Sequence, residues 1–386
     1  MPTFPTYKLG DVAEIILGQS PESKSYNTKG EGLPFFQGKS EFTDWFPIPN
    51  KWCTEPKKIA EPLDILLSVR APVGPTNVAK EKCCIGRGLA AIRYPECYKY
   101  VLYYLRSVSK HLESKATGTT FSSISGDVIR NLSIPLPPLP TQHQIVSRIE
   151  SLFAELDKAE AHLRTAQQQL KTYRQAVLKS AFEECTNFEK IINYFDVTGG
   201  LTKNSQREKF PIKMPYLRVA NVYFNRLDLS EIKEIGIQES EVKEKLLKKG
   251  DLLFVEGNGS KEQIGRVAIW DGSVENCLHQ NHIIKGRPRG QVSSKYALYY
   301  LISDLGREQI VEVASSTSGL YTLSTDKVRN LKIPYIPLSE QQRIAEEIES
   351  RLSQAEAAEA RIAESLQKTE ALRQSILKKA FSGELV

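Results

Sequence analysis

The pattern of apolar and polar positions is most regular in residues 141–182. Apolar or small side chains recur there at alternating steps of four and three residues for more than four heptads. This spacing places them on one stripe of an α-helix, as in helices that pair with another helix. A similar stripe with more drift runs through residues 339–386. The expected seam positions are Ile145, Ile149, Leu152, Leu156, Ala159, Leu163, Ala166, Leu170, Tyr173 and Val177, then Ile344, Ile348, Leu352, Ala355, Ala358, Ile362, Leu366, Leu372 and Ile376.

A proline-rich run leads into each expected helix. The first copy reads RNLSIPLPPLPTQHQIVSRIES from Arg130, and the second reads RNLKIPYIPLSEQQRIAEEIES from Arg329. Because proline breaks a helix, the prolines at 135, 137, 138 and 140 predict that the first helix starts after them. Thr141 with Gln144, and Ser339 with Gln342, have the spacing of a capping box.

These runs belong to an internal repeat. Residues 124–182 align without a gap to residues 323–381, with 24 identities in 59 pairs. Upstream the match weakens but persists, as in KYVLYYLRS from Lys99 and KYALYYLIS from Lys295. A whole unit is therefore repeated, with a similar C-terminal part and a divergent N-terminal part.

The divergent parts have the pattern of mixed α/β domains with short strands, among them DILLSVRAPVG, RVAIW and NHIIKG. KYVLYYLRSVSKHLESKA and KYALYYLISDLGREQIVEVA each predict one helix. We expect an α+β protein of two mixed domains related by a pseudo-two-fold axis, separated by an antiparallel coiled coil of two long helices. The expected segments are 1–140, 141–182, 183–338 and 339–386. Two separate surface helices, or pairing with another chain, remain alternatives.

Composition excludes several classes of protein. Hydrophobic residues make up 40% of the 386 residues and charged residues 25%, as in globular domains. We find no apolar run long enough to span a membrane and no signal peptide, so we expect a cytoplasmic protein. The net charge of +6 permits a nucleic-acid partner without requiring one. The six cysteines form no CxxC pair, so we expect free thiols in the core.

The sequence lacks the motifs that nucleotide binding, metal binding or catalysis would require. GLPFFQGKS has five residues between its glycines, where a phosphate loop requires four. HQNH, from His279 to His282, corresponds roughly to GRGL, from Gly86 to Leu89, so the second unit would have a site that the first lacks. A hydrogen-bonding strand or loop edge is therefore favoured over a metal site. We find no HExxH, no serine triad and no adenine methyltransferase signature. No catalytic or metal-binding residue is therefore predicted.

The order of these segments resembles the specificity subunit of type I restriction–modification systems, over essentially the whole chain. The resemblance rests on the repeated IPLPPLPTQHQI and IPYIPLSEQQRI, the opening KLGDVAEIILGQSP and the closing AFSGELV. It implies that residues 1–140 and 183–338 are target recognition domains, here called reader 1 and reader 2. Each reader would recognise one half of a bipartite, non-palindromic site in double-stranded DNA.

The resemblance also implies partners. The two helices would set the spacer between the half-sites and dock two methyltransferase subunits, and that complex would recruit motor-nuclease subunits. S-adenosylmethionine, ATP and Mg²⁺ would belong to those partners, so this chain would be non-catalytic. Two alternatives outside type I systems stay open, a DNA-binding coiled-coil scaffold and an uncharacterised nuclease.

Candidate DNA contacts are polar residues near the ends of expected strands, because Arg, Lys, Asn and Gln read base edges and phosphates. The sequence does not separate base contacts from phosphate contacts. The candidates are Gln37, Lys39, Arg70 and Arg87 in reader 1, and Arg218, Asn221, Asn258, Lys261, Gln280 and Asn281 in reader 2.

Overall fold

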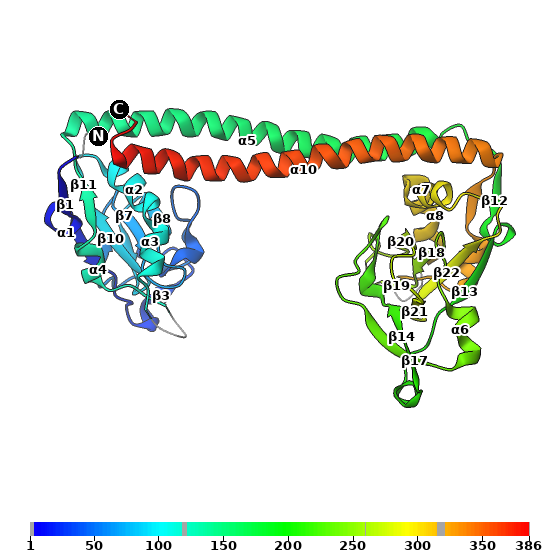
Figure 1. Cartoon of the computed structure of the whole chain (residues 1–386). Helices are drawn as coiled ribbons and strands as arrows, with labels where there is room; N and C mark the ends of the chain where they lie inside the picture. The colour runs from blue at the N-terminus through cyan, green and yellow to red at the C-terminus, as the bar shows by residue number, and fades with distance from the viewer. Residues whose placement is uncertain (1–3, 118–121, 259, 315–320, 386) are drawn as a thin grey trace. The chain divides into compact units, whose positions relative to one another are not determined.

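The computed structural model describes residues 4–117, 122–258, 260–314 and 321–385 (Figure 1). The chain forms two compact units. The first comprises Met1–Arg164 with Ala363–Val386, and the second comprises Thr165–Ile362. Two long helices, α5 (Leu139–Phe182) and α10 (Leu338–Ser382), each contribute to both units. Mixed domains with two long helices confirm the predicted fold class.

The main sheet of the first unit is antiparallel, with strand order β2-β10-β7-β8. A second sheet has the order β3-β5-β4-β9-β6, and within it β4 and β9 are parallel. β1 pairs with β11 at the edge of the domain. The strands are β1 (Thr6–Lys8), β2 (Glu14–Leu17), β3 (Tyr26–Asn27), β4 (Leu33–Phe36), β5 (Trp52–Cys53), β6 (Ile59–Ala60), β7 (Ile65–Ser68), β8 (Thr76–Val78), β9 (Cys83–Ile85), β10 (Leu89–Arg93) and β11 (Ser133–Pro135). The short helices are α1 (Leu9–Val12), α2 (Tyr98–Ser107), α3 (Ser109–Ser114) and α4 (Gly126–Arg130).

The second unit repeats this plan. Its main sheet has the order β13-β22-β18-β20, and its second sheet, β17-β14-β21, again contains a parallel pair, β14 with β21. The strands are β12 (Phe188–Lys190), β13 (Phe195–Gly199), β14 (Ile212–Leu217), β15 (Val222–Tyr223), β16 (Arg226–Leu227), β17 (Lys233–Ile237), β18 (Leu252–Val255), β19 (Gly257–Asn258), β20 (Val267–Ile269), β21 (Leu278–His279), β22 (Ile283–Pro288), β23 (Tyr321–Thr322) and β24 (Lys332–Pro334). The helices are α6 (Glu239–Lys245), α7 (Ser294–Ile302), α8 (Asp304–Ala314) and α9 (Thr325–Asn330).

Two helices predicted as continuous are broken. Val108 separates α2 from α3, with φ −101° and ψ 8°, outside the helical region. Ser303 separates α7 from α8. Its hydroxyl donates to the carbonyl of Tyr300 at 2.6 Å and accepts from the amide of Gly306 at 3.4 Å. One serine thereby ends the first helix and caps the next.

The long helices begin earlier than the capping pattern indicated. α5 starts at Leu139, so Pro140 lies in its first turn, where a missing N–H leaves no hydrogen bond unmade. The predicted capping boxes are not what fixes these starts. Buried Gln142 donates to the carbonyl of Pro137 at 2.9 Å and accepts from the Tyr94 hydroxyl at 3.2 Å. Gln341, 199 residues on, donates to the carbonyl of Ile336 at 2.8 Å and accepts from the amide of Ser293 at 2.9 Å.

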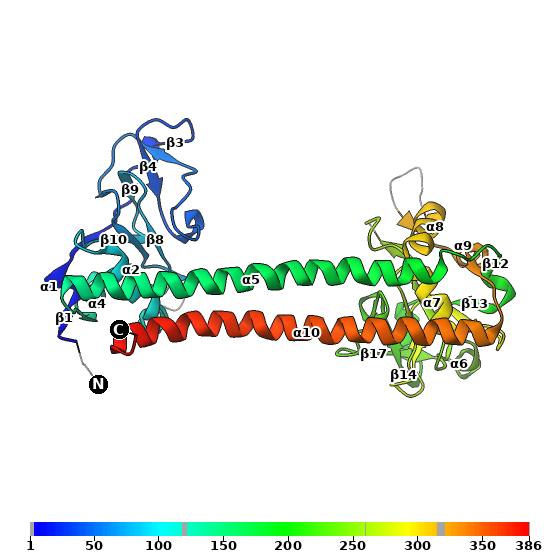
Figure 2. The same cartoon turned by 90° about the horizontal axis from the view of Figure 1, so that it is seen from above.

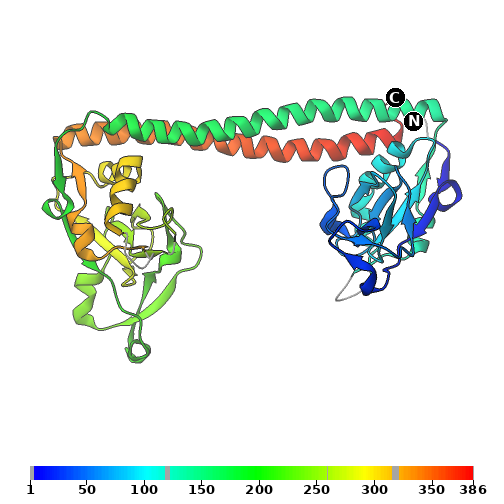
Figure 3. The ribbon, with the colours of Figure 1, turned by 180° about the vertical axis from the view of Figure 1, so that it is seen from behind.

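In each unit one short reader helix anchors the pair of long helices (Figures 1 and 3). In the first unit Lys99 of α2 pairs with Glu150 at 2.7 Å. The rings of Tyr100 and Tyr104 pack on the ring of Phe381, with centroid distances of 5.2 and 5.3 Å. The second unit repeats the arrangement on α7. Its contacts are Lys295 with Glu349 at 2.7 Å, and Phe182 with Tyr296 and Tyr300 at 5.3 and 5.4 Å. Each reader core is therefore completed by the end of one long helix and the start of the other.

Within each unit α5 and α10 run side by side and antiparallel (Figure 2). Arg373 of α10 pairs with Asp157 and Glu160 of α5 in the first unit. Arg174 pairs with Glu359 at 3.0 Å and with Glu356 at 4.0 Å in the second. These residues correspond across the repeat. The predicted antiparallel pairing within one chain is confirmed.

The predicted seam positions differ in depth. Ile145 and Ile149 are fully buried and Ile348 nearly so. Leu156, Leu163, Leu170, Ile344, Ile362, Leu366 and Ile376 are half-buried. Three assignments in the longer pattern are wrong, because Tyr173 is 41% exposed, Leu372 is 50% exposed and Ala159 is exposed. A helix of 3.6 residues per turn drifts out of a strict heptad, so Glu160, Arg174 and Arg373 take those places and carry the ion pairs.

Candidate nucleic-acid interface

Three loops of reader 1 meet where β4, β7 and β9 end. The parallel pairing of β4 with β9 brings Gln37 beside Arg87, because both residues follow the same edge of the sheet. The amide of Gly86 donates to the carbonyl of Phe36 at 2.8 Å. The amide of Val69, after β7, donates to the carbonyl of Gly88 at 2.9 Å. These bonds hold residues distant in sequence at one place.

Reader 2 builds the same three-loop frame from β14, β18 and β21. The amide of Gln280 donates to the carbonyl of Leu217 at 2.9 Å, and the amide of Glu256 donates to the carbonyl of His282 at 2.9 Å. Each bond matches one in reader 1. The side chains do not match, since Gln37 gives way to Arg218, Gly38 to Val219, Arg87 to Asn281 and Gly88 to His282. The frame is thus shared and its exposed side chains are specific to each reader.

In reader 1 the four predicted contacts surround one small hollow of about 200 Å³. Gln37, Lys39, Arg70 and Arg87 line it and all are exposed. The rest of its wall comes from Gly38, Ser68, Ala71 and Gly88, so no carboxylate lines the hollow. A Cβ on Gly88 would lie 2.2 Å from the carbonyl oxygen of Gln37, so only glycine lets the loops approach this closely.

This hollow has the chemistry of a site for nucleic acid. Among the described residues, no ion pair engages Lys39, Arg70 or Arg87. Their charge is free to meet phosphate oxygens, and Gln37 and the arginines can also donate to base edges in a major groove.

In reader 2 the predicted residues divide into two groups. Asn221 is only 3% exposed. It accepts from the amide of Arg218 at 2.8 Å and donates to the carbonyls of Asp228 and Glu231 at 2.7 and 3.1 Å. Its amide group is fully occupied in fixing the loop, so we assign it a structural role and remove it from the DNA contacts.

The other residues of reader 2 reach the surface to different degrees. Arg218 retains 21% of its side-chain exposure, and Gln280 and Asn281 are half-buried. Lys261 is exposed in the turn after β19, the strand that Asn258 ends. The structure thus brings Arg218, Gln280 and Asn281 onto the frame, whereas Lys261 lies in the turn after β19.

Sequence reasoning missed two residues on this frame, His282 and Glu256. His282 has a side chain 56% exposed, and its Nδ1 lies 2.8 Å from Oε2 of Glu256. The HQNH motif was the available signal, but it was considered only for metal binding. Its other histidine, His279, is fully buried and donates from Nδ1 to the carbonyl of Ile283 at 2.9 Å. Burial, with the nearby Lys285, lowers the pKa of His279 to about 3, so it is neutral.

Metal and thiol chemistry find no support in the described residues. No group of three or more His, Cys, Asp or Glu side chains among them could hold a metal ion. All six cysteines are free, and five are buried, as predicted. Burial raises the pKa of Cys83, Cys84 and Cys277 to about 12, which makes these thiols poor nucleophiles.

Two domains with the same loop frame, different exposed side chains and a shared pair of helices define a duplicated DNA-reading protein. The family model for the type I restriction modification DNA specificity domain matches residues 1–164 and 188–368. The chain belongs to this family, and its role is DNA recognition, as the resemblance implied.

The chain is similar to several specificity subunits. Over 142 residues the chain is 44% identical to the MjaX specificity subunit of Methanocaldococcus jannaschii, covering 36% of this chain and 33% of that protein. It is 26% identical over 374 residues to the EcoKI specificity subunit of Escherichia coli K12, covering 90% of this chain and 80% of that one. A crystal structure of the HsdS subunit from Thermoanaerobacter tengcongensis is 46% identical, covering 40% of this chain and 38% of that chain, with a TM-score of 0.37.

Within the part of the chain that the structure describes, no helix is both long and apolar enough to cross a membrane.

Proposed function

We propose that this chain selects the DNA sequence for a type I restriction–modification complex, with each reader recognising one half of a bipartite, non-palindromic site. One observation carries the proposal. The two readers keep the same backbone bonds between their three loops and present different side chains on them. A shared frame supports binding to the same kind of molecule, and different side chains support different base sequences.

The helices supply the second part of the proposal. Residues 141–182 and 339–386 dock two methyltransferase subunits and set the spacer, while residues 1–140 and 183–338 read. The repeated anchors at Glu150 and Glu349, and the repeated ion pairs of Arg373 and Arg174, support two equivalent surfaces for one kind of partner. The complex then recruits motor-nuclease subunits, and it works in the cytoplasm.

Catalysis is assigned to the partners. S-adenosylmethionine binds to the methyltransferase subunits, and ATP and Mg²⁺ act in the motor-nuclease subunits. Isolated from them, this chain would neither methylate nor cleave DNA. Metal-dependent cleavage by the purified chain would favour a nuclease instead, and absence of salt-dependent DNA binding would favour a structural coiled-coil scaffold with no DNA role.

The test is an exchange of residues 1–140 for the corresponding domain of a related specificity subunit. The hybrid is co-expressed with its methyltransferase, and methylated adenines are mapped across the host genome. We expect one half of the motif to change and the other half and the spacer to stay. Expression of the chain without methyltransferase is the control and should add no methylation. A motif that changes in both halves, or in neither, contradicts the proposal.

A further inference from the structure

Arg218 stands at the position of reader 2 that matches Gln37 of reader 1, and a carboxylate holds it. Its Nη2 lies 3.1 Å from Oε2 of Glu231 and donates to the backbone carbonyl of Glu231 at 3.2 Å. Glu231 is itself an exposed side chain, and it also pairs with Lys233 at 3.3 Å. Arg218, followed by Lys233, holds the pKa of Glu231 below its ordinary value, so the carboxylate is charged at neutral pH.

The backbone around this pair is fixed independently of the pair. Asn221 bonds both to the amide of Arg218 and to the carbonyl of Glu231, so it ties together the two loops that carry the side chains. Because Asn221 is buried, this tie is protected from water. Arg218 therefore approaches Glu231 from a fixed backbone.

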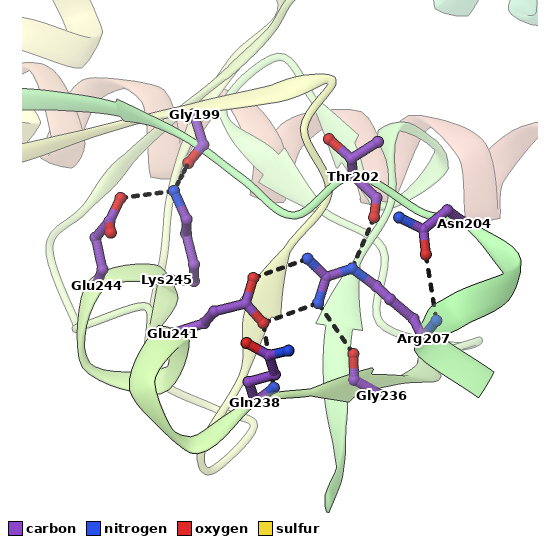
Figure 4. A network of polar contacts seen from close by, with 9 residues as sticks. All are labelled: Gly199, Thr202, Asn204, Arg207, Gly236, Gln238, Glu241, Glu244 and Lys245. Atoms are coloured by element: carbon purple, nitrogen blue, oxygen red, sulfur yellow. Dashed lines mark hydrogen bonds and ion pairs between the residues drawn. The ribbon is translucent and has the colours of Figure 1, made fainter. Parts of the chain in front are cut away.

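A comparison within reader 2 separates this pair from a purely structural one. Figure 4 shows the guanidinium of Arg207 enclosed by protein acceptors. It donates to both carboxylate oxygens of Glu241 at 2.9 and 3.1 Å, to the carbonyl of Gly236 at 3.2 Å and to that of Thr202 at 2.7 Å. Arg207 thus uses each of its three nitrogens within the protein.

Arg218 uses only one nitrogen. Among the described residues, its Nη1 has no hydrogen-bond partner and its buried Nε has none either. An arginine bound along one side by a carboxylate keeps its remaining N–H groups in a fixed direction, because the guanidinium is planar and rigid. Nη1 thereby keeps its N–H groups for acceptors such as O6 and N7 of guanine in the major groove.

We propose that Glu231 is a positioning residue that holds Arg218 for recognition of a guanine in the half-site of reader 2. The proposal rests on the proposed function, since it requires that reader 2 faces DNA. Glu231 itself does not touch the base. The two Nη2 hydrogens face the carboxylate and the backbone carbonyl of Glu231, so the N–H groups of Nη1 remain for the guanine.

The test uses the variant Glu231→Gln in the assembled methyltransferase complex. Binding is measured on duplexes that carry the mapped site and every single-base replacement of it. We expect discrimination at one guanine of the second half-site to fall about tenfold, with preferences elsewhere unchanged. Arg218→Ala should relax the same position, and the double variant should be no worse than Arg218→Ala. Glu244→Gln is the matched control, because Glu244 is an equally exposed partner of Lys245 in the same reader.

Each other outcome has a definite meaning. If Arg218→Ala relaxes one position and Glu231→Gln does not, Glu231 does not position the arginine and the proposal fails. If Arg218→Ala weakens binding to all duplexes equally, Arg218 contacts phosphate and the proposal also fails. If exchange of residues 183–338 leaves the motif unchanged, the proposed function fails with it. A thermal unfolding curve for each variant shows whether reader 2 is folded.

Discussion

The two readers share a frame and differ in how they hold their exposed donors. In reader 1, Lys39, Arg70 and Arg87 surround a hollow with no carboxylate on its wall. In reader 2, Glu231 contacts Arg218 and Glu256 contacts His282. Unpaired cations suit attraction to phosphates, which needs little orientation, whereas donors fixed by carboxylates suit base edges, which need defined geometry. The two copies of the fold therefore differ in their exposed groups. Reader 1 presents unpaired cations, and reader 2 presents donors held in place by carboxylates.

The largest expected effect tests whether the shared frame is equally important in both readers. Asp64 and Asp251 are almost fully buried, and each binds one arginine, Arg93 or Arg287, through two hydrogen bonds of 2.7–2.9 Å. Asp64→Ala and Asp251→Ala should each destabilise their own unit by about 3–5 kcal/mol, since each deprives a half-buried arginine of its buried carboxylate partner. Arg93 keeps its pair with Glu14, which is exposed. Denaturant unfolding of each variant measures this. As a control, Asp127→Ala removes an exposed ion pair and should lower the free energy of unfolding by under about 1 kcal/mol. Clearly unequal losses for Asp64→Ala and Asp251→Ala would show that the two readers do not depend equally on this buried pair.

A smaller effect separates the readers by pH. His279 of reader 2 occupies the strand position of Ile85 in reader 1. Burial lowers the pKa of His279 from 6.5 to about 3, so as pH falls below 6.5 the unfolded chain takes up a proton that the folded chain does not. Stability present above pH 6.5 is thus lost on acidification, by about 2 kcal/mol between pH 7 and pH 5.

The variant His279→Ile isolates the contribution of His279 to the pH dependence of stability, because every other titratable group stays in place. Its loss of stability between pH 7 and pH 5 should be smaller than that of the unaltered chain by about 2 kcal/mol. Trp270 is buried in the second unit, so its fluorescence reports unfolding there when Trp45 and Trp52 are replaced by phenylalanine. An identical pH dependence with and without His279 would contradict the assignment.

The smallest effect concerns the hollow of reader 1. Arg70→Ala should weaken binding to all duplexes and reduce the slope of log affinity against log salt by about 0.9, as expected for one lost phosphate contact. The methylated motif should stay the same. Lys110→Ala, on α3, is an exposed control. A changed preference at one base pair would show that Arg70 reads sequence, and the contrast between the readers would then disappear.

The repeat predicted the architecture well because its signals are local. Alternating four- and three-residue steps and the proline runs located both helices, and the gapless alignment of residues 124–182 with 323–381 related the two units. Tyr173 and Leu372 were misplaced because a strict heptad ignores the drift of a real helix. The start of α5 at Leu139 was missed because it depends on tertiary contacts that a local pattern does not encode. The hydrogen bond between Gln142 and Tyr94 of reader 1 is one of these contacts.

The candidate interface was harder to predict than the fold. Gln37, Arg70 and Arg87 are brought together by the parallel pairing of β4 with β9 and by the contact of Val69 with Gly88, two long-range contacts that no local pattern encodes. Asn221 looked like a DNA contact because its burial cannot be read from one sequence. Glu231 was not considered, since carboxylates are not sought where DNA is expected. Its importance depends on a neighbour 13 residues away.

The contact of Phe381 with Tyr100 and Tyr104 also bears on how the chain folds during synthesis. The core of the first unit includes Leu377 and Ala380, so the domain that leaves the ribosome first lacks part of its core until residues 377–381 have been added. The second unit, whose residues all lie between 165 and 362, is complete earlier. At about 5–20 residues per second, reader 1 waits roughly 10–50 seconds for its closing helix. A nascent chain that stops short of Leu377 therefore carries a finished second domain and an unfinished first one, with unburied tyrosines open to chaperones and proteases.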